Sequence, residues 1–274
     1  MRYFVRRRLT NAAIAVAAVA LAAWQTRRLE LALRPTAFFT GWLLLAAVAF
    51  CALYNARKRL PAAPLGSSAA WLQAHLYVAL ASGGVFALHV PWRWPNGWLE
   101  GALFALYAAT LVSGVIGLYW TRTLPRKLSR ISEEVVYERI PMLRGQLRDR
   151  AQAAVLTAVR TAGAATLGEF YRERLHDYFE RRRGWRYRLL PNMDLRKQLL
   201  AELTESTRYF SDGERATAEQ LFALVRRRDD LDFHEALQWR LKTWLFVHIA
   251  LTAPLLAVAV VHAWLAHLFY GGAL

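Results

Sequence analysis

The sequence predicts an all-α integral membrane protein, a helical bundle with five transmembrane helices and a helical insert between the fourth and the fifth. Three observations lead to this prediction. Hydrophobic residues make up 56% of the 274 residues. Lys and Arg outnumber Asp and Glu by 36 to 20, which gives a formal net charge of +16. Mean hydropathy is nevertheless positive, at +0.16, so the apolar residues must be concentrated in long runs, as in multi-pass membrane proteins.

Five apolar runs approach the length of about 20 residues that crosses the ~30 Å hydrocarbon core of a bilayer. They extend from Thr10 to Trp24, from Ala37 to Tyr54, from Ala69 to Val90, from Trp98 to Trp120 and from Trp244 to Tyr270. The first run is short and alanine-rich, and it follows three arginines, as the apolar part of a signal peptide would. No convincing cleavage site precedes Gln25, so we interpret this run as a retained signal-anchor helix.

The flanking charges predict the orientation, because cytoplasmic loops carry an excess of Lys and Arg. With the N-terminus in the cytoplasm, 13 flanking cations lie inside and 4 lie outside. The inner set is Arg2, Arg6, Arg7, Arg8, Arg57, Lys58, Arg59, Arg122, Arg126, Lys127, Arg130, Arg240 and Lys242, and the outer set is Arg27, Arg28, Arg34 and Arg93. We therefore expect a bacterial inner-membrane protein with a cytoplasmic N-terminus and a periplasmic C-terminus.

This topology divides the chain into residues 1–120 with four spans, a cytoplasmic insert at 121–240, and residues 241–274 with the fifth span. The insert carries charges of both signs, as solvated helical domains do. Apolar residues at roughly helical spacing predict a helix from Ser132 to Arg150, broken or kinked at Pro141. The sequence Ser211-Asp212-Gly213-Glu214 is a capping-box pattern that predicts the start of a helix running through Leu221 to Arg228.

The histidines are the main candidates for function, and five of the seven fall in or beside the apolar runs. Ionisable groups within a bilayer are costly and are usually functional. His75 and His89 are 14 residues apart on the third span, and His248 and His262 are 14 apart on the fifth. Fourteen residues are four turns at 3.5 residues per turn, so in a supercoiled bundle both histidines of a span face one way, about 21 Å apart along the helix.

The third and fifth spans run in the same direction, which places His75 level with His248 and His89 level with His262. Each pair could supply both axial ligands of a haem iron, an arrangement suited to electron transfer. Because Cys51 is the only cysteine, disulfide frameworks, thiolate zinc sites, four-cysteine iron–sulfur clusters and covalent haem attachment are excluded. We therefore predict two non-covalent b haems. A single membrane histidine would more often pack or relay protons.

Several other residues are candidates for contact with the haems. Four cations lie where they could pair with haem propionates, or equally with lipid phosphates: Arg93, Arg122, Arg240 and Lys242. Small residues at 82–84, and Gly114 with Gly117, would admit either a macrocycle or a neighbouring helix. His267 has a minor chance of a propionate contact, whereas His176 and His234 are expected to be surface or packing residues.

The His-x13-His pattern on two parallel spans that flank a third resembles the dihaem transmembrane cytochromes b. The family comprises the b subunit of quinol:cytochrome c oxidoreductases, the b-561 cytochromes, and the transmembrane half of ferric reductases and NADPH oxidases. The resemblance covers spans two to five and implies that His75, His89, His248 and His262 ligate two b haems. It leaves the first span and the insert unexplained.

The sequence also departs from the patterns of these families. It contains no Pro-Glu-Trp-Tyr motif of a quinol-oxidising site, and Ser113-Gly114-Val115-Ile116-Gly117 lies within a span rather than after a strand, where a dinucleotide-binding loop would begin. No flavin or nicotinamide domain follows the fifth span. We therefore expect an electron-transfer subunit supplied by quinol or by a cytoplasmic redox partner, which passes electrons to a partner protein outside.

The insert contains a basic and aromatic segment, Arg181-Arg182-Arg183-Gly184-Trp185-Arg186-Tyr187-Arg188. Lipid headgroups explain it most simply, an acidic redox partner is the second explanation, and RNA is the least favoured, so no nucleic-acid partner is expected. An alternative function is a membrane signalling or assembly protein that acts through the insert and whose histidines only pack. A metal transporter is disfavoured, because its ligands would cluster at the midplane rather than in two tiers.

Overall fold

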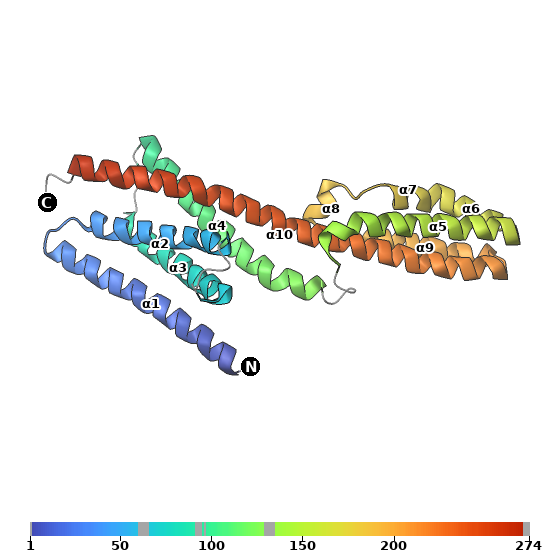
Figure 1. The fold of residues 1–274 in the computed structure, drawn as a ribbon, viewed down its shortest axis with the longest axis horizontal. Coiled ribbons are helices and arrows are strands. Elements are labelled where there is room, and N and C mark those ends of the chain that lie inside the picture. Colours follow the sequence, from blue (N-terminus) through green and yellow to red (C-terminus); the bar gives the residue numbers. More distant parts are fainter. Residues whose placement is uncertain (1, 60–65, 91–94, 96, 129–134, 271–274) are drawn as a thin grey trace. The chain divides into compact units, whose positions relative to one another are not determined.

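The computed structural model describes residues 2–59, 66–90, 95, 97–128 and 135–270. Within these ranges every regular element is a helix and no strand occurs, so the predicted all-α class is confirmed (Figure 1). The loop at 91–94, which contains Arg93, lies outside the described residues, as do residues 129–134 at the start of the helix expected from Ser132.

Five described helices are long and apolar enough to cross a membrane, which indicates a multi-pass membrane protein. They are α1 (Arg2–Leu31), α2 (Thr36–Arg59), α3 (Ser68–His89), α4 (Gly97–Leu128) and α10 (Asp212–Tyr270). The first helix is longer than expected, with 30 residues, because its arginine-rich ends are helical as well. Arginine is a good helix former, so the helix does not end where the apolar run ends.

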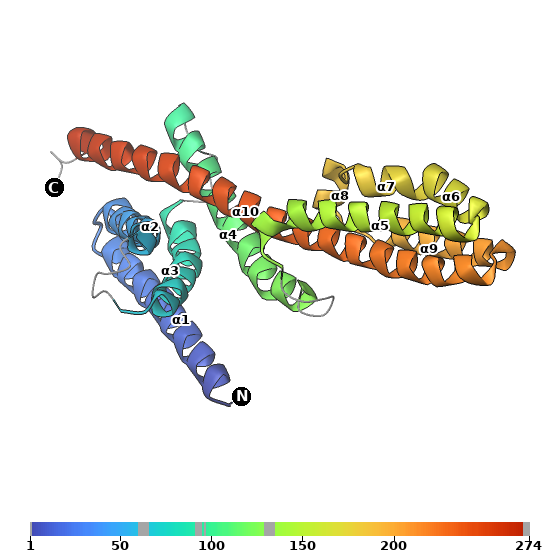
Figure 2. The same ribbon diagram turned by 45° about the vertical axis from the view of Figure 1, so that its right-hand side comes forward.

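The chain separates into two compact units. Unit 1 comprises Met1–Gly117 and Leu245–Leu274, and unit 2 comprises Leu118–Trp244. The boundaries fall within three or four residues of those drawn from the sequence, at 120 and 240. Helix α10 belongs to both units, since it continues without interruption from Asp212 to Tyr270 (Figures 1 and 2).

In unit 1, α3 packs against both α1 and α2. A small residue is needed where α1 and α3 meet, because a Cβ atom on Gly84 would lie 2.6 Å from a methyl group of Val19. Helix α4 is joined to α3 by the side chain of Tyr107, which shares a 2.8 Å hydrogen bond with Ser82 and stacks on Phe86 with 4.1 Å between ring centroids. Small residues on α3 thus let the neighbouring helices approach closely.

Unit 2 is a helical domain around a hydrophobic core. The core is formed by buried residues such as Ile140, Leu167, Leu175, Leu203 and Leu221, each with an exposed fraction of 0%. Its elements between α4 and α10 are a 3-10 turn (Tyr137–Arg139), α5 (Ile140–Ala162), α6 (Ala165–Phe170), a π-helical turn (Tyr171–Leu175), α7 (His176–Glu180), α8 (Trp185–Leu189), α9 (Asp194–Ser206) and a second 3-10 turn (Thr207–Tyr209).

Two sequence-based expectations for unit 2 need correction. Pro141 does not break a helix but lies in the first turn of α5, where its missing N–H costs nothing because first-turn N–H groups have no partner within the helix. The capping box at Ser211 is confirmed, since Ser211 N–H donates to Glu214 Oε2 at 2.9 Å. The helix that it opens does not end near Arg228, however, but continues into the fifth apolar run.

Candidate functional site

The four predicted ligands lie on two helices of unit 1, His75 and His89 on α3 and His248 and His262 on α10. The ring centroids of His75 and His248 are 6.4 Å apart, and the ring planes are inclined by 73° in an edge-to-face arrangement. The structure therefore brings His75 and His248 together, and all four side chains are half-buried. That His89 and His262 form a second pair stays a prediction.

His75 is oriented by α2. Its Nδ1–H donates to the backbone carbonyl of Cys51 at 3.1 Å, and the Cys51 thiol donates to the carbonyl of His75 at 3.7 Å. Because a carbonyl can only accept, Nδ1 must carry a proton, and in the neutral ring the lone pair is then on Nε2. This is the tautomer that a metal-ligating histidine adopts when its second nitrogen is held by a backbone carbonyl.

His89 lies 14 residues after His75 on α3, and α2 orients it as well. The hydroxyl of the fully buried Thr40 donates to the carbonyl of Thr36 at 3.0 Å, and its oxygen lies 2.8 Å from His89 Nδ1. Since the hydroxyl proton is used by the backbone, the oxygen accepts from Nδ1–H. Gly41 leaves room for the ring, because a Cβ atom at that position would lie 3.2 Å from His89 Cε1.

His248 is held from α4. Its Nδ1 shares a hydrogen bond of 3.2 Å with the hydroxyl of the buried Ser113. A Cβ atom on the next residue, Gly114, would lie 3.6 Å from His248 Cε1, so the α4 backbone approaches the ring closely. The hydroxyl and the glycine therefore do on α4 what Thr40 and Gly41 do on α2: each pair supplies one hydrogen bond and one space beside the ring.

His75 and His248 would be the residues to hold one haem iron between them. With a first-row metal–imidazole bond of about 2.0 Å and ~1.1 Å from the nitrogen to the ring centre, two imidazoles on opposite sides of one metal would have centroids about 6 Å apart. The separation in the structure is 6.4 Å. The described residues contain no group of three or more His, Cys, Asp or Glu able to hold a bare metal ion, whereas a haem needs only two protein ligands.

The cations expected at the propionates belong to unit 2, apart from Arg93 in the undescribed loop. Arg122 is exposed near the end of α4. The guanidinium of Arg240 lies 4.8 Å from the centre of the Trp120 ring. The Lys242 ammonium lies 2.8 Å from Glu138 and 4.0 Å from the Tyr137 ring centre. Their contact with haem propionates therefore stays a prediction.

The remaining histidines have other surroundings. His267 Nδ1–H donates to the carbonyl of Ala263 one turn earlier, at 2.9 Å, and its exposed ring is edged by Phe38 and Trp42 at 5.1 and 5.5 Å between centroids. His234 is fully buried and His176 is exposed, as expected for packing and surface residues.

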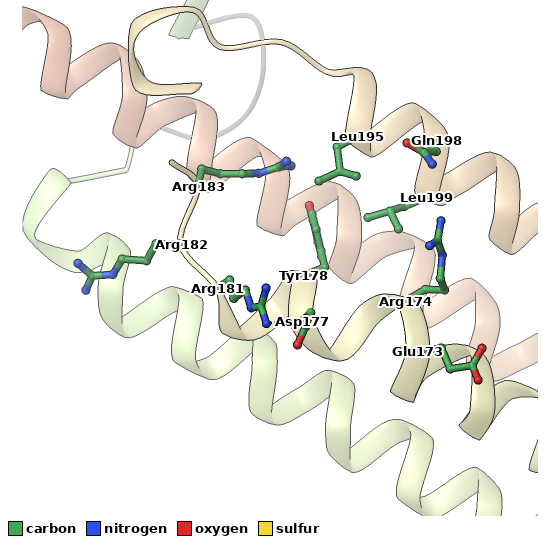
Figure 3. A pocket seen from close by; sticks show the side chains of 10 residues that line it. All are labelled: Glu173, Arg174, Asp177, Tyr178, Arg181, Arg182, Arg183, Leu195, Gln198 and Leu199. Carbon is green, nitrogen blue, oxygen red and sulfur yellow. Dashed lines mark ion pairs between the residues drawn. The ribbon is translucent and has the colours of Figure 1, made fainter. Parts of the chain in front are cut away.

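A second feature that could bind a ligand is a cavity of about 400 Å³ in unit 2 (Figure 3). Four arginines line it, but Arg174 pairs with Glu202, Arg181 with Asp177 at 3.1 Å, and Arg183 with Asp229 at 3.0 Å. Figure 3 shows the fourth, Arg182, extending away from the other lining side chains. The cavity therefore does not concentrate positive charge on a bound group.

Near this cavity, α10 carries a buried ion cluster that is structural. Arg228 and Asp232 are almost fully buried and pair with each other, and Asp232 also accepts from Arg144 at 2.7 Å. Burial raises the pKa of neighbouring Asp229 to about 6 although Arg183 lies 3.0 Å away. Breaking such a cluster is costly because it leaves a charge buried without a counter-ion, so the cluster fixes how α10 sits within unit 2.

Sequence reasoning missed the residues that orient the histidines: Thr40, Gly41, Ser113 and the Cys51 carbonyl. A hydroxyl within an apolar span was the available signal for Thr40 and Ser113, since buried hydroxyls need partners. No signal could identify the Cys51 carbonyl, because every residue has one.

Searches against protein-family models, curated proteins and solved structures gave no match. The function of the chain is therefore inferred from the four histidines and the residues that hold them.

Proposed function

We propose that this chain is a dihaem b-type cytochrome that relays electrons through the bacterial inner membrane, as a subunit of a larger complex. The observation that supports this most is the approach of His75 and His248 to 6.4 Å, with the Nδ1 of each ring bonded to a neighbouring helix. One haem would be held by His75 and His248, and the other by His89 and His262. Bis-imidazole haem iron exchanges electrons and has no open position for oxygen.

The protein residues would bind and orient. The Nδ1 bonds to the Cys51 carbonyl and to Thr40 fix both rings of α3 in the tautomer with its lone pair on Nε2. Such outer partners also raise the basicity of the ligating nitrogen. Ser113 fixes the rotation of the His248 ring on α10. The histidines lie in two tiers about 21 Å apart along each helix, which would place one redox centre near each face of the membrane.

The donor is proposed to be quinol or a cytoplasmic redox protein, and the acceptor a redox protein outside. Both proposals rest on the sequence, which contains no dinucleotide-binding loop after a strand. The proposed orientation, with the insert in the cytoplasm, rests on the charge asymmetry of the loops.

Spectroscopy tests the proposal directly. The purified chain should show a b-type α-band in its reduced-minus-oxidised spectrum and about two haems per chain in a pyridine haemochrome assay. His89→Ala and His262→Ala should each remove the haem of the His89–His262 site and spare the other haem. His75→Ala and His248→Ala should each remove the haem of the His75–His248 site instead. His267→Ala, which changes an exposed histidine of the same helix, is the matched control and should keep both.

The alternative is a signalling or assembly protein that acts through its insert. It predicts no haem in the purified chain and no spectral change in any histidine variant. Absence of haem from protein purified with ample haem supply would therefore reject the cytochrome.

A further inference from the structure

We infer that residues 181–190 of unit 2 form a membrane-interface anchor that binds the surface of an anionic phospholipid bilayer. This inference goes beyond the proposed function and does not depend on haem. It rests on the side chains that the segment exposes, on the charges that it leaves unpaired, and on its place at one end of unit 2.

Two arginines of the segment hold it against the rest of unit 2. Arg183 pairs with Asp229 at 3.0 Å and lies 4.9 Å from the centre of the Tyr187 ring. Arg188 lies 3.6 Å from Glu235 and 6.0 Å from the centre of the Trp239 ring. These inward contacts hold α8 against α10 and determine which of its side chains face outward.

The outward side chains are large and apolar. Trp185 is 66% exposed, Leu189 44% and Leu190 79%. Trp185 and Leu189 are four residues apart and share one side of α8. Tryptophan is enriched at the headgroup level of membranes, where its amphipathic ring is stable. Trp185 and Leu189 thus give α8 an exposed apolar side.

The segment also carries two cations without carboxylate partners. Arg182 and Arg186 are exposed, and neither makes an ion pair within the described part of the chain. The contact of Arg186 is with its neighbour, the Trp185 ring, at 5.6 Å. One ten-residue segment thus exposes two guanidinium groups without carboxylate partners and three apolar side chains. This combination suits a bilayer surface, where lipid phosphates lie above the hydrocarbon. An acidic protein would satisfy the charges but would not by itself account for Trp185 and the two leucines.

The segment lies at the end of unit 2 from which α10 enters the fifth apolar run (Figures 1 and 2). Arg188 contacts Trp239, which is five residues before Trp244, the last residue of unit 2. Five helical residues are about 7.5 Å long, which is within the ~10 Å over which the field of a charged membrane extends at moderate salt. The apolar and basic surface is therefore within reach of headgroups.

Hydrogen exchange of the full chain in lipid nanodiscs tests the anchor. We expect amides of residues 185–190 to exchange more slowly in nanodiscs with about 30% phosphatidylglycerol than in pure phosphatidylcholine, because anionic lipid attracts basic segments. Each arginine near an anionic surface contributes about a fivefold preference. The double variant Arg182→Gln/Arg186→Gln should therefore lose up to about 25-fold of the protection, and high salt should have the same effect on the unchanged chain.

A matched control lies at the far end of the same unit. Arg208 and the 78% exposed Tyr209 also place an arginine beside an exposed aromatic ring, but they precede Asp212, where α10 begins, about 40 Å along the helix from Trp239. Their amides should exchange equally in both lipids, and Arg208→Gln should not alter exchange at 185–190. Trp185→Ala should lower protection in both lipids.

Two results would overturn the anchor. One is equal exchange of residues 185–190 in neutral and anionic nanodiscs. The other is a lipid dependence that persists in the Arg182→Gln/Arg186→Gln variant. Protection that appears only with an added acidic protein or RNA, and not with anionic lipid, would identify a different partner and reject the membrane. Equal exchange of all variants in pure phosphatidylcholine, apart from Trp185→Ala, shows that the substitutions leave the fold of unit 2 intact.

Discussion

Replacing Thr40 by valine should weaken one haem site and leave the other intact. Valine has nearly the shape of threonine, so the substitution removes the hydroxyl with little change in packing. The hydroxyl accepts from His89 Nδ1 at 2.8 Å, and its loss leaves a half-buried N–H without that partner, at a cost of about 1–3 kcal/mol. Loss of an outer partner weakens metal binding by about 10- to 100-fold, which is about 1.4–2.7 kcal/mol.

The assay is a haem titration of the apoprotein followed at the Soret band, with the two sites resolved by their reduction potentials. We expect the His89–His262 site of Thr40→Val to bind about 10- to 100-fold more weakly and the His75–His248 site to be unchanged. Thr40→Ser retains the hydroxyl and should bind as the original chain does. Thr110→Val is the matched control, because the half-buried Thr110 hydroxyl on α4 has no hydrogen-bond partner among the described residues.

Two outcomes would refute this reasoning. Equal weakening of both sites would mean that the valine disturbs the bundle rather than one ligand. Unchanged affinity at both sites, with Thr40→Val and Thr110→Val indistinguishable, would mean that the hydrogen bond to His89 does not serve a ligand.

Three further predictions concern the packing and the insert. Gly41→Ala should displace the His89 ring, because the added Cβ would lie 3.2 Å from Cε1, and the haem proposed at His89 and His262 should shift its potential or be lost on washing. Gly84→Ala should lower the thermal unfolding midpoint in detergent by an amount equivalent to about 1–3 kcal/mol, since its Cβ would lie 2.6 Å from Val19; Val19→Ala in the same chain should restore most of it, and failure to restore it would place the strain elsewhere. Asp229 has its pKa raised from 3.8 to about 6 by burial, so the folded state binds the proton more tightly than the unfolded state and the chain gains stability as pH falls through 6 towards 4. Asp229→Asn should remove that gain, and a stability profile with the same slope between pH 7 and 5 in both chains would contradict the assignment.

Local signals were sufficient for the helices and their caps. Apolar runs of about 20 residues located five helices, and the reciprocal hydrogen bonds of Ser211 and Glu214 follow from residues three apart in the sequence. The continuity of α10 could not be predicted in the same way. The composition changes abruptly from charged to apolar near Lys242, which suggests the end of one helix and the start of another. The backbone hydrogen bonds of a helix form equally well with charged and with apolar side chains, so the helix continues.

The pairing of the histidines could be predicted, whereas their orientation could not. Equal 14-residue spacing on two parallel helices requires that both pairs be level if one is, and His75 does meet His248. The partners of Nδ1 depend on how α2 and α4 are rotated about their axes, and nothing in a run such as 36–55 fixes that rotation. A threonine, a serine and a backbone carbonyl share no sequence pattern that would identify them as equivalent.

The threonine, the serine and the carbonyl all contact the same nitrogen of a histidine ring, and this shared position favours a ligand role over simple packing. A histidine that only packs can bond a neighbouring helix through either ring nitrogen. Here the bonds of His75 to α2, His89 to α2 and His248 to α4 are each made by Nδ1. The Nδ1 bond of His267 is not evidence for a ligand role. Its acceptor is a carbonyl one turn earlier on the same helix, which Nδ1 can reach without a neighbouring helix. Three hydrogen-bond partners of different chemistry, on two helices, engage the same ring nitrogen, and His75 and His248 bring their ring centroids to 6.4 Å. This shared geometry is the basis for the proposed ligand role.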